Sequence, residues 1–362
     1  MKDVVIASAC RTAIGAFGGS LRDLHVTKIA SVAMKAAVER AGIDPGRIDD
    51  VRFGCCLEPV DSMNMTRIAA LMAGIPDTVT AATINRVCIS GMEAAVSGMA
   101  MIQAGMADVV LAGGAEHMSG AAYSVFNARW GCRLQDQEFV DNIMRGLHCG
   151  SHLIPHPESG PVDASKPPLS RFKGKPYIMG ATAEFVAQHL NISREEMDEF
   201  ELSSHNNVER AMKIGDFRDE IVPVKIPQRK GDPIVFEKDE HFRPGITLDQ
   251  LRKLPPAFVP EIGKVTAGNS SGINDGAAAI LIMSAEKAKD LGVKPLARIK
   301  AIGRGACHPS VMGLSPVPAV KDLLARSGLK LADFELLEEA DRLVRDVLLE
   351  HHRLFDGEPR LS

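Results

Sequence analysis

Cys88 is the residue of this chain whose surroundings most favour covalent chemistry. It lies in the stretch 85–93, Asn-Arg-Val-Cys-Ile-Ser-Gly-Met-Glu, after a β-branched run and before a segment of small residues. We expect a strand over 79–84 and a helix over 91–105, so that Cys88 precedes the N-terminus of that helix. Unpaired N–H groups and the helix dipole favour a thiolate there, and the thiolate is the form that attacks an acyl carbon. The residues alone leave a second interpretation open, in which Cys88 is buried and packs as a small hydrophobe.

Cysteine and histidine also gather between residues 132 and 156, and this combination can bind zinc. The residues concerned are Cys132, His148, Cys149, His152 and His156. Their spacing matches no standard zinc finger, and Gly150 and Pro155 keep His152 and His156 from sharing a helix face. We therefore predict loop packing or an oligomer contact here, and no metal site.

The composition restricts the class of protein and its partners. The 362 residues are 45% hydrophobic and 24% charged, which is typical of a globular protein with roughly two domains. The formal net charge of -4 gives no general attraction to nucleic acid or to an anionic membrane. No apolar run approaches the about 18 residues of a membrane span, and no signal-peptide core follows Lys2. Seven cysteines without paired spacing indicate a reducing compartment, so we expect a cytoplasmic protein.

The elements that must position Cys88 alternate between strand-like and helix-like stretches over the first 116 residues. Strands are expected at 4–9, 51–55, 79–84 and 108–113, and helices at 26–40, 65–74 and 91–105. This alternation predicts an α/β fold with βαβ units and a mostly parallel sheet. Residues 117–246 contain His/Pro-rich and Lys/Pro-rich loops around two helical stretches, which indicates an inserted loop domain. A small-residue segment, 268–279, then leads into a strand at 280–283.

The end of the chain repeats the pattern of its beginning. The helix, glycine, loop and strand pattern of 37–53 returns at 324–336, with a strand expected at 334–337, which predicts a duplicated fold. Fewer than thirty residues follow Phe334, whereas the first copy needs roughly sixty after its matching strand, so we expect an incomplete second half. We place the N-terminal half at 1–116 plus 247–285, the inserted loop domain at 117–246 and the C-terminal half at 286–362.

Seven motifs in a fixed order make the chain similar to the thiolase family. They lie at 11–15 (Arg-Thr-Ala-Ile-Gly), around Cys88, and at 113–119, 179–184, 193–196, 266–276 and 312–318. The resemblance covers about the first 336 residues. It implies a layered α/β fold (αβαβα) of two related halves with an inserted loop domain. It also implies a transferase of fatty acid metabolism that cleaves 3-ketoacyl-CoA with coenzyme A, or that runs the reverse Claisen condensation.

The resemblance implies roles for four residues. Cys88 is expected to accept the acyl group as a thioester, Met179 and Ser271 to contact coenzyme A, and Arg229 to lie near its nucleotide phosphate. The residue types alone also fit a structural role, with Met179 in a pocket wall and Ser271 in a turn. Coenzyme A is then a substrate, so no cofactor is expected. A homodimer or homotetramer is expected, with a partner subunit as a further possibility.

After Leu336 the chain departs from the family pattern. Thiolases continue with Asn-Glu-Ala-Phe, Gly-His-Pro and Cys-Gly-Gly-Gly segments, which supply a water-positioning asparagine, a base histidine and a second cysteine. Residues 337–344 here read Leu-Glu-Glu-Ala-Asp-Arg-Leu-Val. General acid/base groups each contribute ~10²–10⁴-fold, so their loss would remove most turnover. His308 is a candidate substitute base, against the alternative of a solvated loop residue.

This departure leaves alternatives open. One is a catalytically impaired thiolase homologue that binds acyl-CoA or a partner subunit. Another is ketoacyl-synthase chemistry, which needs two histidines that the chain does not visibly supply. The apolar spacing of 338–354 predicts a helix that caps the exposed sheet, and a shifted reading frame is the other explanation of this end.

Overall fold

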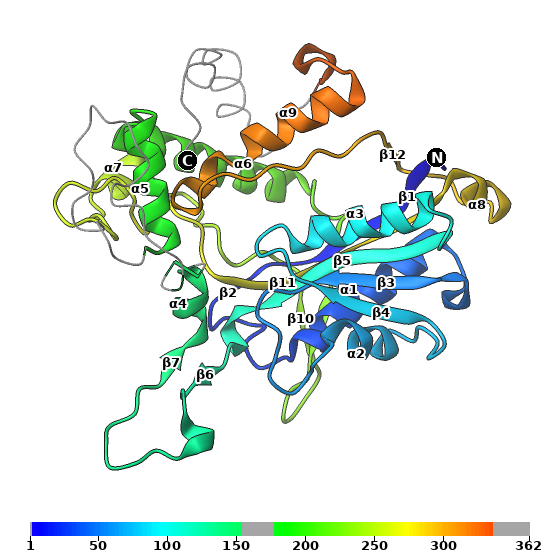
Figure 1. The fold of residues 1–362 in the computed structure, drawn as a ribbon, viewed down its shortest axis with the longest axis horizontal. Coiled ribbons are helices and arrows are strands. Elements are labelled where there is room, and N and C mark those ends of the chain that lie inside the picture. Colours follow the sequence, from blue (N-terminus) through cyan, green and yellow to red (C-terminus); the bar gives the residue numbers. More distant parts are fainter. Residues whose placement is uncertain (1, 149, 152, 154–176, 336–362) are drawn as a thin grey trace. The chain divides into compact units, whose positions relative to one another are not determined.

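A computed structural model describes residues 2–148, 150–151, 153 and 177–335 of the chain (Figure 1). The chain divides into two compact units. The first comprises Met1–Gly146, Phe200–Leu248 and Ser271–Ile299, and the second comprises Leu147–Glu199, Asp249–Ser270 and Lys300–Ser362. These two units are compact regions and do not test the domain boundaries that the sequence predicts at residues 116, 246 and 285. Those boundaries stay a prediction.

The first unit is built on a mixed β-sheet. Its main strand order is β12-β1-β11-β5-β3-β4, with β2 paired to β11 and β8 paired to β1. The strands are β1 (Val4–Thr12), β2 (Gly15–Ala16), β3 (Asp50–Gly54), β4 (Thr80–Ile84), β5 (Val109–His117), β8 (Ile221–Val222), β11 (Asn274–Ser284) and β12 (Ala297–Ile299). The predicted α/β class is confirmed, but the prediction of a mostly parallel sheet is wrong. Strands β3, β4 and β5 run parallel, whereas β11 lies antiparallel between β1 and β5 because the chain enters it from the carboxyl end of β5.

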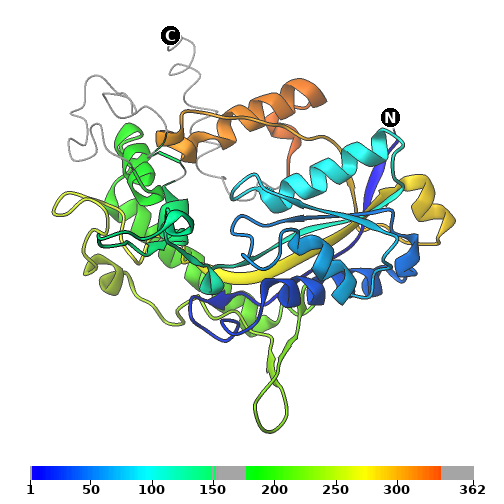
Figure 2. The same ribbon diagram turned by 60° about the horizontal axis from the view of Figure 1, so that its bottom comes forward.

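Helices cover both faces of this sheet (Figures 1 and 2). Helices α1 (Val26–Ala41) and α2 (Met65–Met72) pack on one face, and α3 (Ser90–Gln103) packs on the other. Helix α1 buries a stripe at helical spacing that includes Ile29, Ala33 and Ala37, and it ends at Gly42 with φ of 67°. The first unit therefore has the three-layer arrangement expected of an α/β fold.

The central strand β11 is longer than the sequence indicates. The small-residue segment was expected to lead into a strand at 280–283, but its residues 274–279 already form the first half of β11. Both neighbours of β11 are strands, and Ala277 and Ala279 are buried on the face that packs in the core with α1, whereas Ala278 on the opposite face is exposed. Close packing on the α1 face therefore favours small side chains there, which outweighs their low strand propensity.

The shorter elements complete the two units. In the first unit they are β6 (Tyr123–Ser124), β7 (Val140–Asp141), β9 (Val224–Ile226), β10 (Ile234–Phe236) and α8 (Ala285–Asp290). In the second unit they are α5 (Met179–His189) and α9 (Pro316–Ser327). Helices α4 (Asn142–Leu147), α6 (Arg194–Ile214) and α7 (Leu248–Arg252) each have residues in both units. The short 3₁₀ turns are at Pro45–Arg47, Met118–Gly120, Ala128–Trp130, Pro309–Leu314 and Leu331–Asp333.

The predicted repeat appears in the local structure of both copies. Helix α1 ends at Gly42 in the left-handed region and is followed by the 3₁₀ turn Pro45–Arg47. Helix α9 likewise ends at Gly328, with φ of 70°, and is followed by the 3₁₀ turn Leu331–Asp333. The strand predicted at 334–337 is not formed at 334–335, and its last two residues lie outside the described residues. The helix predicted at 338–354 also lies outside them.

The described helices include none with the length and apolar character that a membrane crossing requires.

Candidate active site

Cys88 lies on an exposed turn between β4 and α3. The interpretation of Cys88 as a buried, small hydrophobe is therefore wrong. The residue before it, Val87, has φ of 51°, a left-handed conformation that β-branched residues rarely adopt. Such a residue costs on the order of 1–3 kcal/mol and persists only where its surroundings hold it.

Four hydrogen bonds within the turn hold Val87. The Val87 N–H donates to Asn85 Oδ1 at 3.0 Å, and the Arg86 N–H donates to Ser90 Oγ at 2.9 Å. The Val87 carbonyl accepts from the Ser90 N–H at 3.0 Å and from Ser90 Oγ at 2.5 Å. These bonds offset the strain at Val87 and fix the backbone from which the Cys88 side chain projects.

Helix α3 begins two residues after Cys88 and has no side-chain cap. Its N-cap residue is Ile89, whose apolar side chain accepts no hydrogen bond from the backbone N–H groups at the start of the helix. The Ser90 N–H is bonded to the Val87 carbonyl, which leaves the N–H groups of Gly91 and Met92 available to an anion, and the helix dipole adds positive potential there.

Glycines let the start of α3 lie directly on the sheet. A Cβ atom at Gly54 would lie 2.4 Å from the Ser90 carbonyl carbon and 2.5 Å from the Gly91 nitrogen. A Cβ atom at Gly114, the neighbour of Gly54 across the β3–β5 ladder, would lie 3.2 Å from Gly91 Cα. We call residues 85–90 the nucleophile turn, because Cys88 is the candidate nucleophile. This turn is packed against the carboxyl ends of the parallel strands β3 and β5, where α/β proteins commonly bind their ligands.

The loop after β3 is anchored by a carboxylate at the end of β5. Glu116 accepts the backbone N–H of Cys56 at 2.8 Å and that of Leu57 at 3.0 Å. Burial raises the pKa of the Cys56 thiol to about 11, so this thiol is protonated at neutral pH. Burial also raises the pKa of the neighbouring Cys55 thiol, which Glu116 raises further.

The β11 register brings Ser271 to the same end of the sheet as Cys88. Strand β11 is antiparallel to β5, with Asp275 opposite His117, so its first residues lie at the carboxyl end of β5. The buried Asp275 carboxylate accepts the Ser119 N–H at 2.9 Å, and its Oδ2 atom lies 3.9 Å from His117 Nε2. Two of the sequence motifs, 113–119 and 266–276, therefore meet at Asp275. Ser271, three residues before β11, is exposed.

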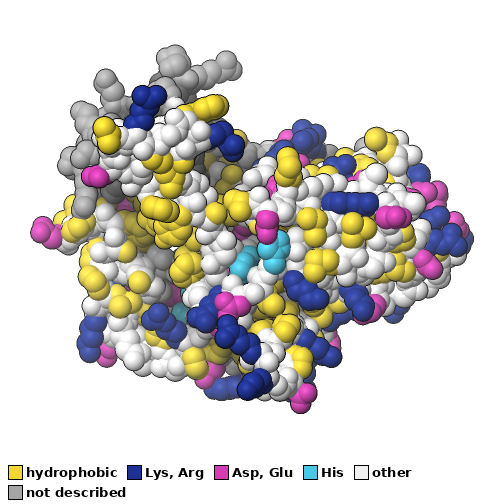
Figure 3. All heavy atoms as spheres, turned by 90° about the horizontal axis from the view of Figure 1, so that it is seen from below, with side chains coloured by type: hydrophobic (Ala, Val, Ile, Leu, Met, Phe, Trp, Pro, Cys, Tyr) yellow, Lys and Arg dark blue, Asp and Glu magenta, His cyan; other side chains and the backbone are white. Residues whose placement is uncertain are grey.

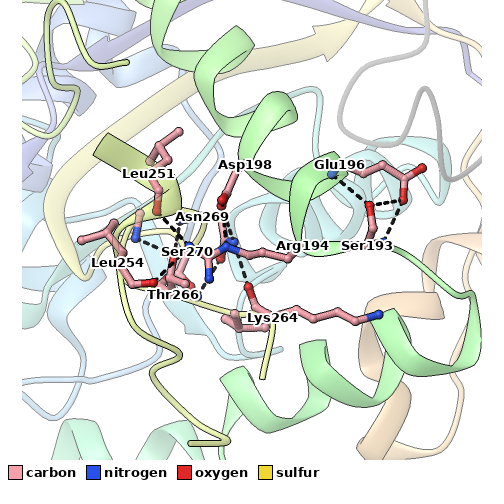
Figure 4. A network of polar contacts seen from close by, with 12 residues as sticks. Ser193, Arg194, Glu196, Asp198, Leu251, Leu254, Lys264, Thr266, Asn269 and Ser270 are labelled. Atoms are coloured by element: carbon pink, nitrogen blue, oxygen red, sulfur yellow. Dashed lines mark hydrogen bonds and ion pairs between the residues drawn. The ribbon is translucent and has the colours of Figure 1, made fainter. Parts of the chain in front are cut away.

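A polar network in the second unit orders the segment that leads to Ser271 (Figure 4). The fully buried Asp198 carboxylate accepts from Arg194 Nε at 2.8 Å and from Asn269 Nδ2 at 2.9 Å. Asn269 Oδ1 accepts the Thr266 N–H at 2.7 Å, and Ser270 Oγ donates to the Thr266 carbonyl at 2.6 Å. Helix α6 thus holds the 266–270 loop in one conformation.

The remaining predicted residues lie on other segments. Arg229 is exposed in the loop between β9 and β10, a hairpin that projects from the first unit in Figure 2. Met179 is the half-buried first residue of α5 in the second unit. His308, also in the second unit, is exposed, and its Nδ1 atom lies 2.8 Å from Ser310 Oγ. Cys88, Arg229 and Ser271 therefore share one unit, and Met179 and His308 share the other.

Among the described residues, no group of three or more histidine, cysteine and acidic side chains is arranged to hold a metal ion. Cys132 is exposed, and Cys149, His152 and His156 lie outside the described residues. The prediction of no metal site at 132–156 is therefore untested.

Four residues that hold the nucleophile turn were not predicted from the sequence: Asn85, Ser90, Cys56 and Glu116. A signal was present for Asn85 and Ser90, because their side chains can bond to backbone groups two to four residues away and so favour turns. No local signal links Cys56 or Glu116 to Cys88, since Cys56 lies in the loop after β3 and Glu116 lies on β5.

Comparisons with known proteins cover nearly the whole chain. Residues 4–155 and 169–286 match the family described as "Thiolase, N-terminal domain", and residues 293–355 match "Thiolase, C-terminal domain". The chain is 43% identical to the acetyl-CoA acetyltransferase of Cupriavidus necator, over 98% of this chain and 84% of the relative. The crystal structure of the Bacillus anthracis acetyl-CoA acetyltransferase superposes with a TM-score of 0.83 at 41% identity, over 93% of this chain and 79% of that one. Human mitochondrial 3-ketoacyl-CoA thiolase in complex with CoA superposes with a TM-score of 0.81 at 37% identity, over 92% of this chain and 78% of that one.

Proposed function

Since this chain belongs to the thiolase family, we propose that it transfers acyl groups between coenzyme A thioesters through a covalent thioester on Cys88. The acyltransferase class follows from the family and from relatives that are 43% and 42% identical and are both named acetyl-CoA acetyltransferase. The observation that carries the mechanism is the placement of Cys88: it is exposed, follows the strained Val87 and precedes the uncapped start of α3.

In the thiolytic direction the Cys88 sulfur attacks the 3-keto carbon of a 3-ketoacyl-CoA. The bond between C2 and C3 breaks, C2 takes a proton, and acetyl-CoA leaves. The thiol of free coenzyme A then attacks the Cys88 thioester, which releases the shortened acyl-CoA and restores the Cys88 thiol. Negative charge develops on the carbonyl oxygen in both steps, and the N–H groups of Gly91 and Met92 in the first turn of α3 are suited to stabilise it.

Coenzyme A enters this proposal as a substrate, with no bound cofactor. Ser271 is exposed at the same end of the sheet as Cys88, which supports a contact with the coenzyme. Arg229 is exposed beside Lys230 and is free to approach a phosphate group from solution. Met179 at the start of α5 remains the proposed contact for the acyl end.

Acylation of Cys88 is tested by incubation with acetyl-CoA followed by intact-mass measurement. We expect one added acetyl group on the wild type and none on Cys88→Ala. Cys132→Ala is the matched control, because Cys132 is also an exposed cysteine but lies between β6 and β7, away from α3. An equal adduct on Cys88→Ala, or its loss in Cys132→Ala, would overturn the assignment of Cys88.

Thiolysis of acetoacetyl-CoA tests the complete reaction. Turnover that is abolished by Cys88→Ala supports the acyltransferase and is incompatible with the alternative of a catalytically impaired homologue. That alternative has no support in the comparisons, because the relatives matched over 93% to 98% of this chain are named as enzymes. An acetyl adduct without turnover would favour it.

We also propose that the chain forms a homo-oligomer. Large apolar side chains are exposed on its surface (Figure 3). Four of them lie between β6 and β7: Phe126, Trp130, Leu134 and Phe139. Strand β4 ends the sheet order, so that among the described residues no strand pairs with its outer edge. Light scattering on Trp130→Glu tests this. A particle mass equal to that of the wild type would contradict a role of the segment between β6 and β7 in the oligomer.

A cytoplasmic location remains our prediction.

A further inference from the structure

The thiol of Cys56, in the loop after β3, reaches the backbone of the nucleophile turn. Its Sγ atom lies 2.8 Å from the Val87 carbonyl oxygen and donates to it, and it lies 3.6 Å from Ser90 Oγ. In return, Asn85 Nδ2 donates to the Cys56 carbonyl at 3.2 Å. The loop after β3 and the turn after β4 are thus joined in both directions by hydrogen bonds.

The Val87 carbonyl therefore accepts from three donors: the Ser90 N–H, Ser90 Oγ and Cys56 Sγ. The two Ser90 donors belong to the turn itself and move with it. Among the described donors to this carbonyl, the Cys56 thiol alone comes from outside the turn, from the loop after β3. The thiol can act as a donor throughout the neutral pH range because burial keeps it protonated.

Cys56 is itself held in place from β5. Glu116 accepts the N–H groups of Cys56 and Leu57, as described above, and β5 is an inner strand of the sheet. A continuous series of contacts therefore runs from β5 through Glu116 and Cys56 to Val87. The Val87 carbonyl and the Cys88 N–H belong to one planar peptide unit, so a bond that fixes the first also fixes the direction of the second.

We propose that Cys56 is a positioning residue for Cys88. Its thiol holds the strained Val87 peptide against the sheet and so keeps the Cys88 sulfur at the start of α3. This inference rests on the proposed function in one respect: it takes Cys88 to be the nucleophile that must be positioned.

The test compares Cys56→Ala with Cys56→Ser, since serine keeps a donor and alanine removes it. The rate constant of Cys88 acetylation at saturating acetyl-CoA should fall about fivefold in Cys56→Ala, the loss expected for one net hydrogen bond. Cys56→Ser should stay within about twofold of the wild type on the same reasoning. The acetyl-CoA concentration that gives half the maximal rate should not change in either variant, because Cys56 contacts the turn and not the coenzyme.

Cys10→Ala is the matched control. Cys10 Sγ also donates to a backbone carbonyl, that of Ala33 at 3.3 Å, but it does so beneath α1 on β1. This variant loses a bond of the same type in the same unit and should acetylate Cys88 at the wild-type rate. Thermal unfolding of all three variants identifies any general loss of stability.

A second rate separates this inference from the proposed function. Alkylation of Cys88 by iodoacetamide, followed by peptide mass spectrometry, needs no acyl-CoA and depends on how the sulfur is held at the helix N-terminus. It should also slow in Cys56→Ala and recover in Cys56→Ser. Equal alkylation rates in wild type and Cys56→Ala, or a Cys56→Ser variant as slow as Cys56→Ala, would overturn the positioning role even if Cys88 is acetylated normally. Absence of an acetyl adduct on the wild type would instead overturn the proposed function, and the alkylation rates would still decide the role of Cys56.

Discussion

Substitution of Gly54 by alanine should displace the nucleophile turn as a unit. The added Cβ atom would lie 2.4 Å from the Ser90 carbonyl carbon, 2.5 Å from the Gly91 nitrogen and 2.7 Å from Ser90 Cβ. Two of these are backbone atoms, which have no rotamer to change. Ordinary contact between such atoms begins near about 3.5 Å, so the start of α3 must retreat by about 1 Å.

A shift of this size has a predictable cost for both activity and stability. Misplacement of a reacting group by about 1 Å lowers the rate on the order of 100-fold, so Cys88 acetylation should be slowed by this amount in Gly54→Ala. Overpacking of a well-packed core costs about 1–3 kcal/mol, which sets the expected loss in the free energy of unfolding. A rate that is about 100-fold slower corresponds to about 2.7 kcal/mol of activation free energy, so the losses in rate and in stability should be of similar size.

Two assays and one control decide this prediction. Acetylation of Cys88 is timed by intact-mass measurement, and stability is measured by urea unfolding. Gly146→Ala is the control, because a Cβ atom there would meet only Leu57 Cδ2 at an ordinary 3.7 Å. If Gly54→Ala acetylates Cys88 as fast as Gly146→Ala does, the close packing of α3 on β3 does not position the nucleophile, and this reasoning is refuted.

Three further outcomes are expected. Asp198→Ala should lower the free energy of unfolding by about 3 kcal/mol, because the half-buried Arg194 guanidinium loses its fully buried carboxylate and Asn269 Nδ2 loses an acceptor. The exposed Glu199→Ala should change it little in urea unfolding. Glu116→Ala should slow Cys88 acetylation about tenfold, since two loop N–H groups lose their shared acceptor, and rates equal to the wild type would contradict this. The pKa of the Cys56 thiol is raised by burial from 9.0 to about 11, so the folded state holds this proton more tightly and loses stability as the pH rises through that window. Unfolding curves at several pH values should show that stability falls less with rising pH in Cys56→Ser than in the wild type. An equal pH dependence of the free energy of unfolding in the two proteins would argue against this pKa shift.

Local sequence patterns were sufficient for most elements around Cys88. The β-branched run before it, the small residues after it and the glycine at the end of α1 each act through backbone preferences, and β4, α3 and the end of α1 follow them. Strand β11 was only half predicted because the small side chains of Ala277 and Ala279 are favoured by the layer packed against them and carry no strand signal of their own. The left-handed Val87 opposes its own preference and could not be predicted from its type.

Sequence patterns identified the candidate nucleophile Cys88, whose role stays a prediction, but not the residues that support its turn. Glu116 and Cys56 are 60 residues apart, and neither lies near Cys88 in sequence. Their contact arises only when the carboxyl ends of β3, β4 and β5 come together, which is a property of the sheet order. The roles of Met179, Arg229 and Ser271 come from a family resemblance and stay predictions until coenzyme A binding is measured.

The antiparallel strand at the middle of the sheet sets the order in which this protein can fold during synthesis. Strand β1 pairs with β11 through partners such as Val4 and Ser284, and β5 pairs with the opposite edge of the same strand. Until residue 284 has left the ribosome, β1 and β5 each expose an unpaired, apolar edge to solvent. Chains with such long delays between partner strands fold slowly and aggregate readily. Added chaperones should therefore raise the soluble yield more than stabilising substitutions near Cys88, whereas slower translation should lengthen this exposure and lower the yield.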